Sequence, residues 1–431
     1  MKVRALPRLQ SLCDRHEHVV LLWDDRVEGR ALLGIGAKQS ILVDSPRSGD
    51  WMLWDRFIQK THTSSSWSFG WLGYDMHSSL DLAEAQECPP ANGQHPGGWP
   101  LMHWWEPEVV VEWAPGELTP QIVAGEDVSW ANDLVEKLQQ EQATQELAES
   151  SDNAPWEPLQ PNWSKDMYCA KFEVAKLALQ RGDVYEMNLC MPWTGSAPGS
   201  ASWSIFERLA QRTKAPHSAY VQAGPWRTLC ASPERFLAKQ GTTLRSQPIK
   251  GTVKRGSTKE EDDALKASLA NSEKERAENV MIVDLVRNDL SRVAERNTVE
   301  VEELFGIHTF ETVHQMVSTV SCTLRSDVTP LDIMRATFPM GSMTGAPKLS
   351  AMKHIAELEG VGRGVYSGAI GYASPNGDWD LNVVIRSLMH RADTGRVDAT
   401  FGGAITLLSE ANAEYDECLL KAEALRECLM P

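Results

Sequence analysis

GYASPNGDWDLNVVIRSL, residues 371–388, places strand-like runs on either side of the turn-forming residues Pro375, Asn376 and Gly377. Runs joined by such a short polar turn pair as antiparallel neighbours. Helical stretches lie between the strand-like runs elsewhere, so the two kinds of element are intermixed. This combination predicts an α+β layered fold rather than a parallel, doubly wound sheet.

Further elements follow on both sides of this stretch. Ser164 can cap a helix that stops at Gly182. The apolar positions of that helix are Met167, Phe172, Val174, Leu177 and Leu179. Three more helices are expected over 259–269, 272–295 and 410–428. Strand-like runs occupy 18–23, 40–44, 108–113, 218–224, 228–232 and 364–374.

The composition changes near residue 145, which predicts three regions. Residues 1–145 form a tryptophan-rich N-terminal region, in which we expect the tryptophans to pack in the core rather than to form a ligand cage. Residues 146–162 are polar, contain proline and lack strand periodicity, as is typical of a linker. Residues 163–431 carry the remaining motifs and are expected to be the catalytic region.

The charge balance excludes some classes of partner. The chain of 431 residues has 42 Lys and Arg against 59 Asp and Glu, a net charge of −17. Such a field repels nucleic acid and anionic membrane surfaces, so neither is an expected partner. An anionic substrate must therefore be held by a few local cations or by a metal ion.

The expected location is the cytoplasm. The eight cysteines are scattered without metal-ligand spacing and resemble buried thiols of a reducing compartment. The N-terminus lacks the apolar stretch of a signal peptide, and no run of 18 apolar residues occurs. Neither a phosphate-binding loop nor a G-x-S-x-G elbow is present, which disfavours nucleotide-binding and serine-hydrolase functions.

Two carboxylate pairs indicate a possible magnesium site. Glu275 with Glu278, and Glu414 with Glu417, are spaced i,i+3 and so share a helical face. Two such faces opposed would offer oxygen ligands to Mg²⁺, which binds through one or two carboxylates plus substrate oxygens. The plain alternatives are a capping box beginning at Ser272 for Glu275, and a solvated helix face for the second pair.

Three other features permit two interpretations each. Lys421 continues the face of the second pair, where it either neutralises the carboxylates or meets an anionic substrate. Gly402 and Gly403 either let backbone N–H groups approach a carboxylate or form a tight turn. Lys250, in Pro248-Ile249-Lys250-Gly251-Thr252, is either a covalent nucleophile or a solvated lysine beside a glycine.

Taken together, several strings resemble the chorismate-utilising enzymes, a family that includes the component I chains of anthranilate synthase and aminodeoxychorismate synthase. The resemblance covers roughly residues 163 to 427, in the family's order. The matching strings are GDVYEMNL, ASPERFL, PIKGTVKRG, ERAENVMIVDLVRNDLSRV, TVHQMVS, ATFPMGSMTGAPKLSAM, RGVYSGAIGY, LNVVIRSL, and FGGAI followed by AEYDECLLKAEAL. It implies two stacked antiparallel sheets with helices outside, and a Mg²⁺-dependent chorismate site between the layers.

Within the family, Lys250 resembles the aminodeoxychorismate synthase branch, because anthranilate synthases typically carry alanine there. The resemblance implies that Lys250 attacks C2 of chorismate while the C4 hydroxyl leaves, and that ammonia then yields 4-amino-4-deoxychorismate for 4-aminobenzoate and folate synthesis. A nucleophilic amine must be neutral, so we expect the site to depress the pKa of Lys250, with burial and Mg²⁺ acting against the opposing glutamates. Glu234 resembles the general acid, with a raised pKa; its plain alternative is a salt bridge to a neighbouring arginine.

The same resemblance implies roles for the remaining candidates. Glu278 and Glu417 match direct Mg²⁺ ligands, with Glu275 and Glu414 close by or acting through water. His314 matches a histidine near the ring carboxylate, although a lone histidine among apolar residues is usually a satisfied core group. Thr252 and Ser342 line the ring pocket. The enolpyruvyl carboxylate is received by Tyr366, Arg386, Gly402, Gly403 and Lys421.

The expected partner is a separate glutamine amidotransferase that supplies ammonia, because nothing in the chain resembles a glutaminase. The alternatives within the family are anthranilate synthase component I and an isochorismate or salicylate synthase. A catalytically inactive binding subunit is the alternative from another class. Ala404 stands where the family usually has a glycine, which leaves the backbone approach at that point open. The departure from the family pattern at residues 215–220 leaves tryptophan binding open.

Overall fold

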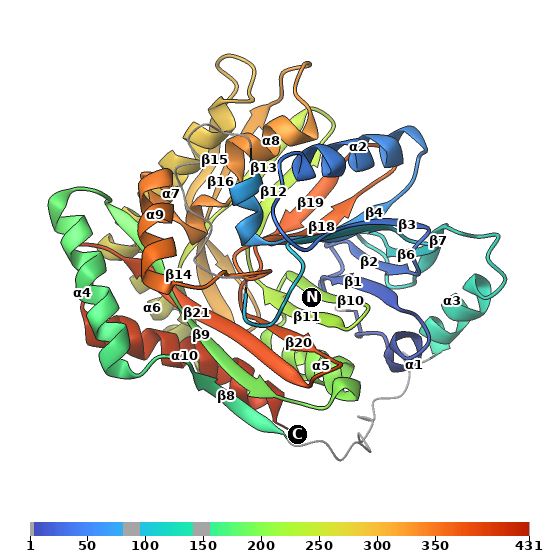
Figure 1. Cartoon of the computed structure of the whole chain (residues 1–431), viewed down its shortest axis with the longest axis horizontal. Helices are drawn as coiled ribbons and strands as arrows, with labels where there is room; N and C mark the ends of the chain where they lie inside the picture. Colours follow the sequence, from blue (N-terminus) through green and yellow to red (C-terminus); the bar gives the residue numbers. More distant parts are fainter. Residues whose placement is uncertain (1–3, 81–94, 141–155, 431) are drawn as a thin grey trace.

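Two antiparallel sheets stacked against each other form the body of the molecule (Figure 1). The computed structural model describes residues 4–80, 95–140 and 156–430. In these residues one sheet has eleven strands and the other ten, and every strand pair is antiparallel. The predicted α+β fold of stacked antiparallel sheets is confirmed.

The eleven-stranded sheet takes strands from both ends of the chain. Its order is β17 (Gly345–Ala346), β9 (Glu186–Ser196), β21 (Arg396–Ile405), β20 (Ser387–Arg391), β11 (Trp226–Ser232), β10 (His217–Ala223), β1 (His18–Trp23), β2 (Ala31–Ile35), β6 (Val109–Trp113) and β7 (Gln121–Ala124), with β8 (Glu157–Pro161) beside β9.

The ten-stranded sheet is similarly mixed. Its order is β14 (Ile249–Lys254), β16 (Val313–Thr323), β13 (Thr243–Gln247), β12 (Arg235–Gln240), β19 (Trp379–Asn382), β18 (Ala369–Ala373), β4 (Ser68–Leu72), β5 (Met102–Glu106) and β3 (Gln39–Val43), with β15 (Glu300–Thr309) beside β16.

Helices cover the outer faces of the two sheets (Figure 1). The cluster on the outer face of the eleven-stranded sheet includes residues of α3 (Ala131–Gln140), α4 (Lys165–Arg181), α5 (Ser202–Thr213), α9 (Lys348–Glu359) and α10 (Ala411–Leu429). The cluster of the ten-stranded sheet includes residues of α2 (Asp50–Thr63), α7 (Glu273–Ser291) and α8 (Pro330–Thr337). Helix α6 (Lys259–Ala270) lies near β14, and the short α1 (Gln10–Cys13) lies near α5.

The stretch 371–388 does more than form the predicted hairpin. Strands β18 and β19 pair as expected, with Gly371 opposite Leu381. The chain then leaves the ten-stranded sheet after Asn382 and enters β20 of the eleven-stranded sheet at Ser387. The hairpin is confirmed, whereas the crossing between sheets has no signature in the local pattern.

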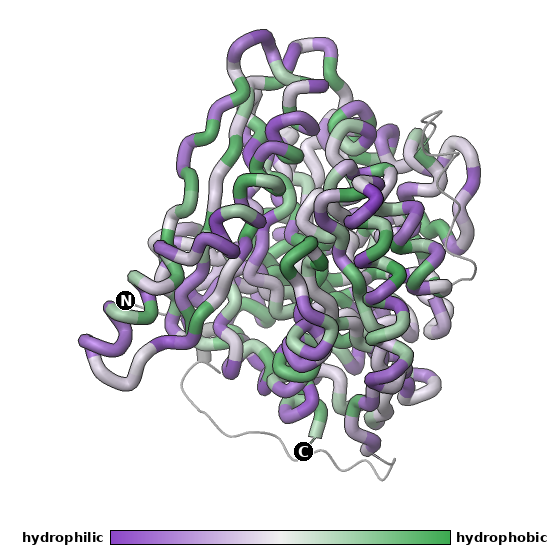
Figure 2. Tube along the Cα trace, turned by 90° about the vertical axis from the view of Figure 1, so that its left-hand side faces the viewer, coloured by the Kyte–Doolittle hydropathy of each residue, from purple (hydrophilic) through white to green (hydrophobic). Residues whose placement is uncertain are grey.

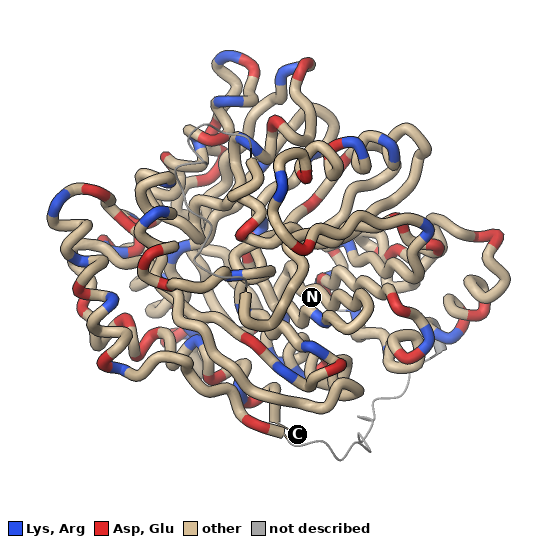
Figure 3. The backbone as a smooth tube through the Cα atoms, viewed as in Figure 1, with Lys and Arg blue, Asp and Glu red and all other residues tan. Residues whose placement is uncertain are grey.

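Alternation along the central strands divides the core into two clusters. In β1, Val20 belongs to the cluster between the sheets, while Val19, Leu21 and Trp23 belong to the cluster under the helices. Both faces of this strand are buried, which accounts for its nearly continuous apolar sequence. Figure 2 shows hydrophobic stretches inside and hydrophilic ones in the outer turns, and Figure 3 shows charges of both signs spread over the outer helices and loops.

The tryptophans of the N-terminal region pack in the core, as predicted. Nine of the ten in residues 1–145 are at most 7% exposed, and Trp130 is half-buried. Several form edge-on aromatic pairs, such as Trp54 with Trp104 at 5.9 Å between ring centroids. Trp54 lies on α2 and Trp104 on β5, so this pair joins a helix to the sheet beneath it.

Helix α4 has the predicted ends and a different buried face. Ser164 accepts a hydrogen bond from the Met167 N–H, and Gly182 ends the helix in the left-handed conformation. Three of the apolar positions named for this helix, Met167, Val174 and Leu177, lie outside the packed face, because they are 48%, 53% and 52% exposed. The residues that the helix buries are Tyr168, Phe172, Ala175, Ala178 and Leu179. Small and aromatic side chains at helical spacing, rather than the longest aliphatic ones, define the packed stripe.

The expected N-terminal and catalytic regions share both sheets. Strands β1, β2, β6 and β7 join one sheet, and β3, β4 and β5 the other. Of the expected linker, residues 146–155 lie outside the described residues, and Glu157–Pro161 form β8. The three-region division therefore stays a prediction. No described helix is long and apolar enough to cross a membrane.

The buried core predicts a contrast between two leucines. Leu72→Ala removes a side chain that is 0% exposed, whereas Leu42→Ala makes the same change where the side chain is 44% exposed. We expect Leu72→Ala to lower the free energy of unfolding by about 2–5 kcal/mol and Leu42→Ala by at most about 0.5 kcal/mol. Urea unfolding followed by circular dichroism measures both, and equal losses would contradict this assignment of the core.

Candidate active site

Two crossings between the sheets bring Glu234 and Arg386 together. The chain passes from β11 to β12 through Pro233 and Glu234, and from β19 to β20 through residues 383–386. The crossings are joined by backbone hydrogen bonds: Val383 N–H donates to the Glu234 carbonyl at 3.0 Å, and Ala231 N–H donates to the Arg386 carbonyl at 3.2 Å. Arg386 has φ +52°, a left-handed conformation that fixes its direction at the junction.

Near the junction of Glu234 and Arg386, the side chain of Lys250 reaches from one sheet to the other. Its Nζ donates to Glu186 Oε1 at 2.7 Å, and the two side chains are 9% and 1% exposed. Lys250 lies on β14 of one sheet and Glu186 on β9 of the other, which meet at the left of Figure 1. Lys250 is therefore a buried, paired lysine, and the solvated alternative is excluded.

Gly251, the residue after Lys250, allows helices α6 and α7 to lie close to strand β14. Gly251 has φ +83°, and a Cβ there would lie 2.9 Å from Leu269 Cδ1 and 3.0 Å from Glu275 Oε2. A larger residue would be both strained and too close to these side chains. Gly251 thus lets helices α6 and α7 approach β14 directly beside Lys250.

Glu234 has the environment expected of a general acid. It is 5% exposed, and burial raises its pKa to about 7, with the Ser342 hydroxyl and the charges of Lys250 and Arg386 limiting the rise. Ser342 Oγ is itself buried without a hydrogen bond of normal geometry among the described residues. The predicted raised pKa agrees with this environment.

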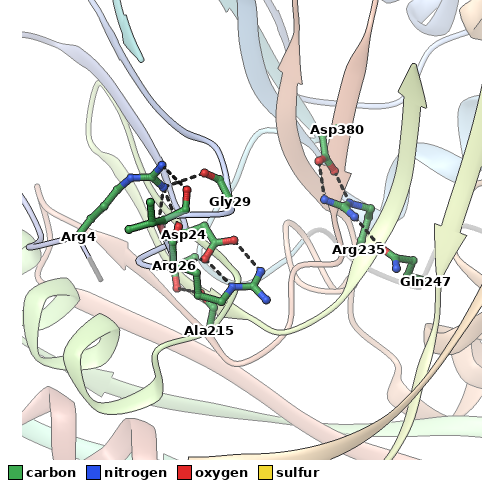
Figure 4. A network of polar contacts seen from close by, with 10 residues as sticks. Arg4, Asp24, Arg26, Gly29, Ala215, Arg235, Gln247 and Asp380 are labelled. Carbon is green, nitrogen blue, oxygen red and sulfur yellow. Dashed lines mark hydrogen bonds and ion pairs between the residues drawn. The ribbon is translucent and has the colours of Figure 1, made fainter. Parts of the chain in front are cut away.

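The arginine beside Glu234 does not neutralise it. Arg235 donates to both carboxylate oxygens of Asp380, at 2.9 and 3.0 Å, and also to Gln247 (Figure 4). Asp380 lies on β19 and Gln247 on β13, the strands on either side of β12. Arg235 is therefore engaged with these two side chains, and the arginine whose charge acts on Glu234 is Arg386.

The pKa of Lys250 corrects a prediction. We expected the site to depress it; burial acts in that direction, but the nearby charges of Glu186, Glu278 and Glu234 and the hydrogen bond that Lys250 donates to Glu186 outweigh burial and raise the pKa. Three carboxylates gathered around one amine favour its charged form. A raised pKa favours the ammonium form of Lys250 at neutral pH, and its proton must leave before the nitrogen can attack a substrate.

Glu278 faces the same space from helix α7. It is 7% exposed, and burial raises its pKa to about 7, opposed by Lys250 and assisted by Glu186 and Glu275. Its Oε1 has no hydrogen-bond partner among the described residues. Glu275 is half-buried; its N–H completes the Ser272 cap at 3.3 Å, but no reciprocal bond from its carboxylate is found in the described chain.

The second carboxylate pair faces the first across a lysine. Lys274 Nζ lies 3.9 Å from Glu278 Oε1 and 3.9 Å from Glu414 Oε1. Helices α7 and α10 thus present acidic groups to one another, with a cation between them. Burial raises the pKa of Glu414, whereas for Glu417 burial is outweighed by Lys421, which lowers its pKa.

Lys421 and the two glycines form the far side of this region. Lys421 Nζ donates to the Gly402 carbonyl at 2.7 Å and lies 2.7 Å from Glu417 Oε1. Gly402 and Gly403 belong to β21 rather than to a turn, and pair with Cys190 and Leu189. A Cβ on Gly403 would lie 3.1 Å from Glu414 Oε2, so the glycine leaves open space beside the carboxylates.

The residues present fit a divalent cation in part. Two observations indicate a site that favours positive charge. Glu278 Oε1 is buried without a hydrogen-bond partner among the described residues, and the Lys274 amine lies between Glu278 and Glu414. Among the described residues, no three His, Cys, Asp or Glu side chains lie close enough to coordinate one ion. Mg²⁺ binds through one or two carboxylates and completes its shell with water and substrate oxygens, and its presence here stays a prediction.

The other ring-pocket candidates lie in mixed environments. Ser342 is buried next to Glu234, whereas Thr252 is exposed and accepts a hydrogen bond from Gln315 at 3.4 Å. Tyr366 is 3% exposed, and its hydroxyl contacts Cys190 Sγ at 3.6 Å.

His314 is engaged away from the central cluster. Both of its ring nitrogens have partners: Nδ1 with Thr309 Oγ1 and Nε2 with Asp262 Oδ1, each at 2.9 Å. The ring is 1% exposed and lies between β15 and α6. The structure therefore supports the satisfied-histidine alternative in this state, and a role beside a substrate carboxylate stays a prediction.

Comparison with known sequences identifies the family. The family model described as chorismate binding enzyme matches residues 18–427 of this chain. The chain belongs to the chorismate binding enzyme family. The match includes the tryptophan-rich N-terminal region, where the strings quoted above are sparse.

Curated relatives align with a little over three fifths of this chain. Aminodeoxychorismate synthase of Streptomyces griseus is 43% identical over 276 residues, which are 63% of this chain and 37% of that one. Aminodeoxychorismate synthase component 1 of Escherichia coli K12 is 40% identical over 266 residues, 62% of this chain and 58% of that one. The aligned part thus spans less than two thirds of either relative.

A solved structure shares the fold of the whole family member. Anthranilate synthase component I from Streptococcus pneumoniae superposes with a TM-score of 0.75 at 24% identity, covering 92% of both chains. At this identity the likeness shows the architecture of two stacked sheets and not the reaction.

The most important residue that the sequence did not single out is Glu186. It lies in GDVYEMNL, which contributed to the resemblance, but the expected roles went to other glutamates. Glu186 begins a strand and is followed by five buried positions. An acidic residue at such a place indicates a partner or a function, because a charge is rarely buried without one. Its partner, Lys250, is distant in sequence and belongs to the other sheet.

Two carboxylic acids should titrate near neutral pH. Burial raises the pKa of both Glu234 and Glu278 to about 7, so their infrared carboxylic-acid bands should disappear between about pH 6 and about pH 8. Because the folded-state values are raised, the associated stability is present at low pH and is lost as pH rises through about 7. Glu234→Gln and Glu278→Gln should each remove part of the signal, whereas exposed Glu173→Gln should not.

Proposed function

We propose that this chain is an aminodeoxychorismate synthase of the component I type. It replaces the C4 hydroxyl of chorismate with an amine from ammonia and forms 4-amino-4-deoxychorismate. The observation that carries the proposal is the buried Lys250 at the sheet junction, beside the isolated acid Glu234. The names of the relatives, aminodeoxychorismate synthases from several organisms, support the same reaction.

The proposed mechanism uses the two residues in complementary roles. Lys250 attacks C2 of the ring as the double bond shifts and the bond from C4 to oxygen breaks. Glu234, which is protonated below about pH 7, donates its proton to the departing hydroxyl. Ammonia then attacks C4, the double bond shifts back, and Lys250 is released. Glu234 takes the proton lost by the new ammonium group.

The substrate carboxylates need cationic and backbone donors. Arg386 lies close enough to Glu234 for their charges to interact, and its guanidinium suits a bidentate contact with the enolpyruvyl carboxylate. Lys421, which donates to the Gly402 carbonyl, would receive the same carboxylate together with Tyr366, Gly402 and Gly403. Ser342 would line the ring pocket, and Thr252 and His314 would join the site only after a change of partner.

Magnesium is part of the proposal. Glu278 and Glu417 would hold Mg²⁺ with help from Glu275 and Glu414, and Lys274 would leave the space between the helices. When bound, the ion would neutralise a substrate carboxylate and act as a Lewis acid. The side chains of α7 and α10 would keep that carboxylate oriented toward the sheet junction.

The proposed partner is a glutamine amidotransferase that supplies ammonia. The relatives from Escherichia coli and Klebsiella aerogenes are named component 1, which implies a second component. In the described part of the chain the cysteines are free, and five of the seven are buried. We assign none of these described cysteines as a glutaminase nucleophile. The ammonia would come from the proposed amidotransferase subunit.

The reaction product distinguishes the proposed function from its relatives. Chorismate, Mg²⁺ and an ammonium salt should give 4-amino-4-deoxychorismate, read by chromatography and mass spectrometry. Anthranilate with pyruvate would identify an anthranilate synthase, and isochorismate or salicylate formed without a nitrogen source would identify the water-using branch. Glu234→Gln should lower the rate by about 10²–10⁴-fold, the range for a lost general acid.

The nucleophile has a separate test by mass spectrometry. Chorismate without ammonia should leave on Lys250 the added mass of chorismate less one water, and Lys250→Ala should abolish it. Lys239→Ala, a half-buried lysine whose amine donates to the Gly377 carbonyl, is the control and should leave the adduct intact. An adduct on another lysine would show that Lys250 is not the nucleophile.

The metal ligands are tested by titration calorimetry. Glu278→Gln should weaken Mg²⁺ binding measured with chorismate present and ammonia absent by at least about tenfold, since even a lost supporting group costs that much. Asp284→Asn lies on the same helix with its side chain 74% exposed, and should bind as the unaltered protein does. Equal binding by both variants would remove Glu278 from the ligand set.

A further inference from the structure

Glu186 and Lys250 form a contact that the proposed reaction has not yet used. The Nζ to Oε1 distance is 2.7 Å, and both side chains are at least nine-tenths buried. The backbone of Glu186 is held in register by β17, where it pairs with Ala346, while Tyr185 N–H donates to the Ala346 carbonyl at 2.7 Å. The carboxylate is therefore held in a defined position against the nitrogen.

The two carboxylate oxygens of Glu186 differ in their hydrogen bonding. Oε2 is buried and has no hydrogen-bond partner among the described residues. A buried carboxylate oxygen without a donor costs free energy, because it has lost its water and gained nothing in return. An ion pair kept only for stability would be expected to satisfy both oxygens. The open oxygen leaves room for a proton on this carboxyl group.

The chemistry requires a proton acceptor at this nitrogen. The hydrogen bond from Lys250 to the Glu186 carboxylate favours the ammonium form, and only the neutral amine has the lone pair that attacks C2. Charged groups face Lys250 from three elements: Glu186 on β9, Glu278 on α7 and Glu234 between β11 and β12. Of these, Glu186 is the one hydrogen-bonded to the amine in the described chain.

The other two carboxyl groups have competing tasks. Glu234 must keep its own proton for the departing C4 hydroxyl, and so cannot also take the proton of Lys250. Glu278 faces Lys274 and Glu414 across the gap between α7 and α10, in the proposed Mg²⁺ site. Geometry and division of roles therefore single out Glu186.

We propose that Glu186 is the catalytic base that removes the proton of the Lys250 ammonium group, an inference that rests on the proposed function. One proton moves from Nζ to a Glu186 oxygen, leaving a neutral amine and a carboxylic acid. The amine lone pair forms the bond to C2, the ring double bond shifts, and the C4 oxygen departs as water with the proton from Glu234. The adduct nitrogen is a secondary ammonium.

The second half of the cycle restores each group. Ammonia forms its bond to C4, the double bond returns, and the bond between C2 and Nζ breaks, which releases the neutral amine of Lys250. Glu186 returns its proton to that amine, and Glu234 takes one from the new C4 ammonium. The sum is chorismate plus ammonia giving 4-amino-4-deoxychorismate plus water, with no other reactant.

The test measures the rate of adduct formation on Lys250 from chorismate and Mg²⁺ without ammonia, by rapid quenching and peptide mass spectrometry. Glu186→Gln keeps the shape and a polar contact but cannot accept the proton, so the rate near pH 7 should fall by about 10²–10⁴-fold. The rate should recover as pH rises, because solvent base then removes the proton. Exposed Glu173→Gln should behave as the unaltered protein does.

A conservative variant separates a base from a packing role. Glu186→Asp keeps a carboxylate and should retain much more of the rate than Glu186→Gln near pH 7; it also carries the test if the glutamine variant does not fold. Equal losses in the two variants, with no recovery at higher pH, would overturn the proposal, as would full activity of Glu186→Gln. If the unaltered protein itself forms neither adduct nor aminated product, the proposed function fails instead.

Discussion

The buried ion pair between Lys250 and Glu186 is the constraint around which the site is built. Each residue comes from a different sheet, so the 2.7 Å contact holds β14 and β9 at a fixed separation. Two charges buried this deeply are tolerated only as partners, since removing either one would leave the other uncompensated. The pair therefore links the architecture to the chemistry: stacking the sheets is what places an amine and its counter-charge at the site.

The pKa values of the neighbouring carboxyl groups depend on this ion pair, on burial and on the other charges around them. Asp380 and Gln247 hold Arg235, and burial raises the pKa of Glu234 to about 7 although the charges of Lys250 and Arg386 oppose the rise. Glu278 reaches a similar pKa, and its Oε1, which has no hydrogen-bond partner among the described residues, lies 3.9 Å from Lys274 between α7 and α10. Burial thus raises the pKa of two carboxylic acids beside a charged amine, and the different environments of similar carboxyl groups divide the roles between them.

The local pattern predicted much of the fold and part of the site. The hairpin β18–β19, the caps of α4 and the burial of the tryptophans follow from turn residues, capping side chains and composition. The apolar positions of α4 did not define its packed face, because aliphatic residues occur on both sides of that helix. The lowered pKa expected for Lys250 was wrong because its strongest neighbour, Glu186, is 64 residues away and was not recognised.

By itself, the sequence determined the class of fold, the family and the identity of the groups that can do chemistry. Those properties depend on local spacing and on strings of residues. The tertiary structure alone decided which groups share a site, because the crossings after Ser232 and Asn382 bring Glu234 and Arg386 to one junction, while His314 is held by Asp262 and Thr309. It also decided the charge of Lys250, since a pKa depends on burial and on distances between atoms that the order of residues does not contain.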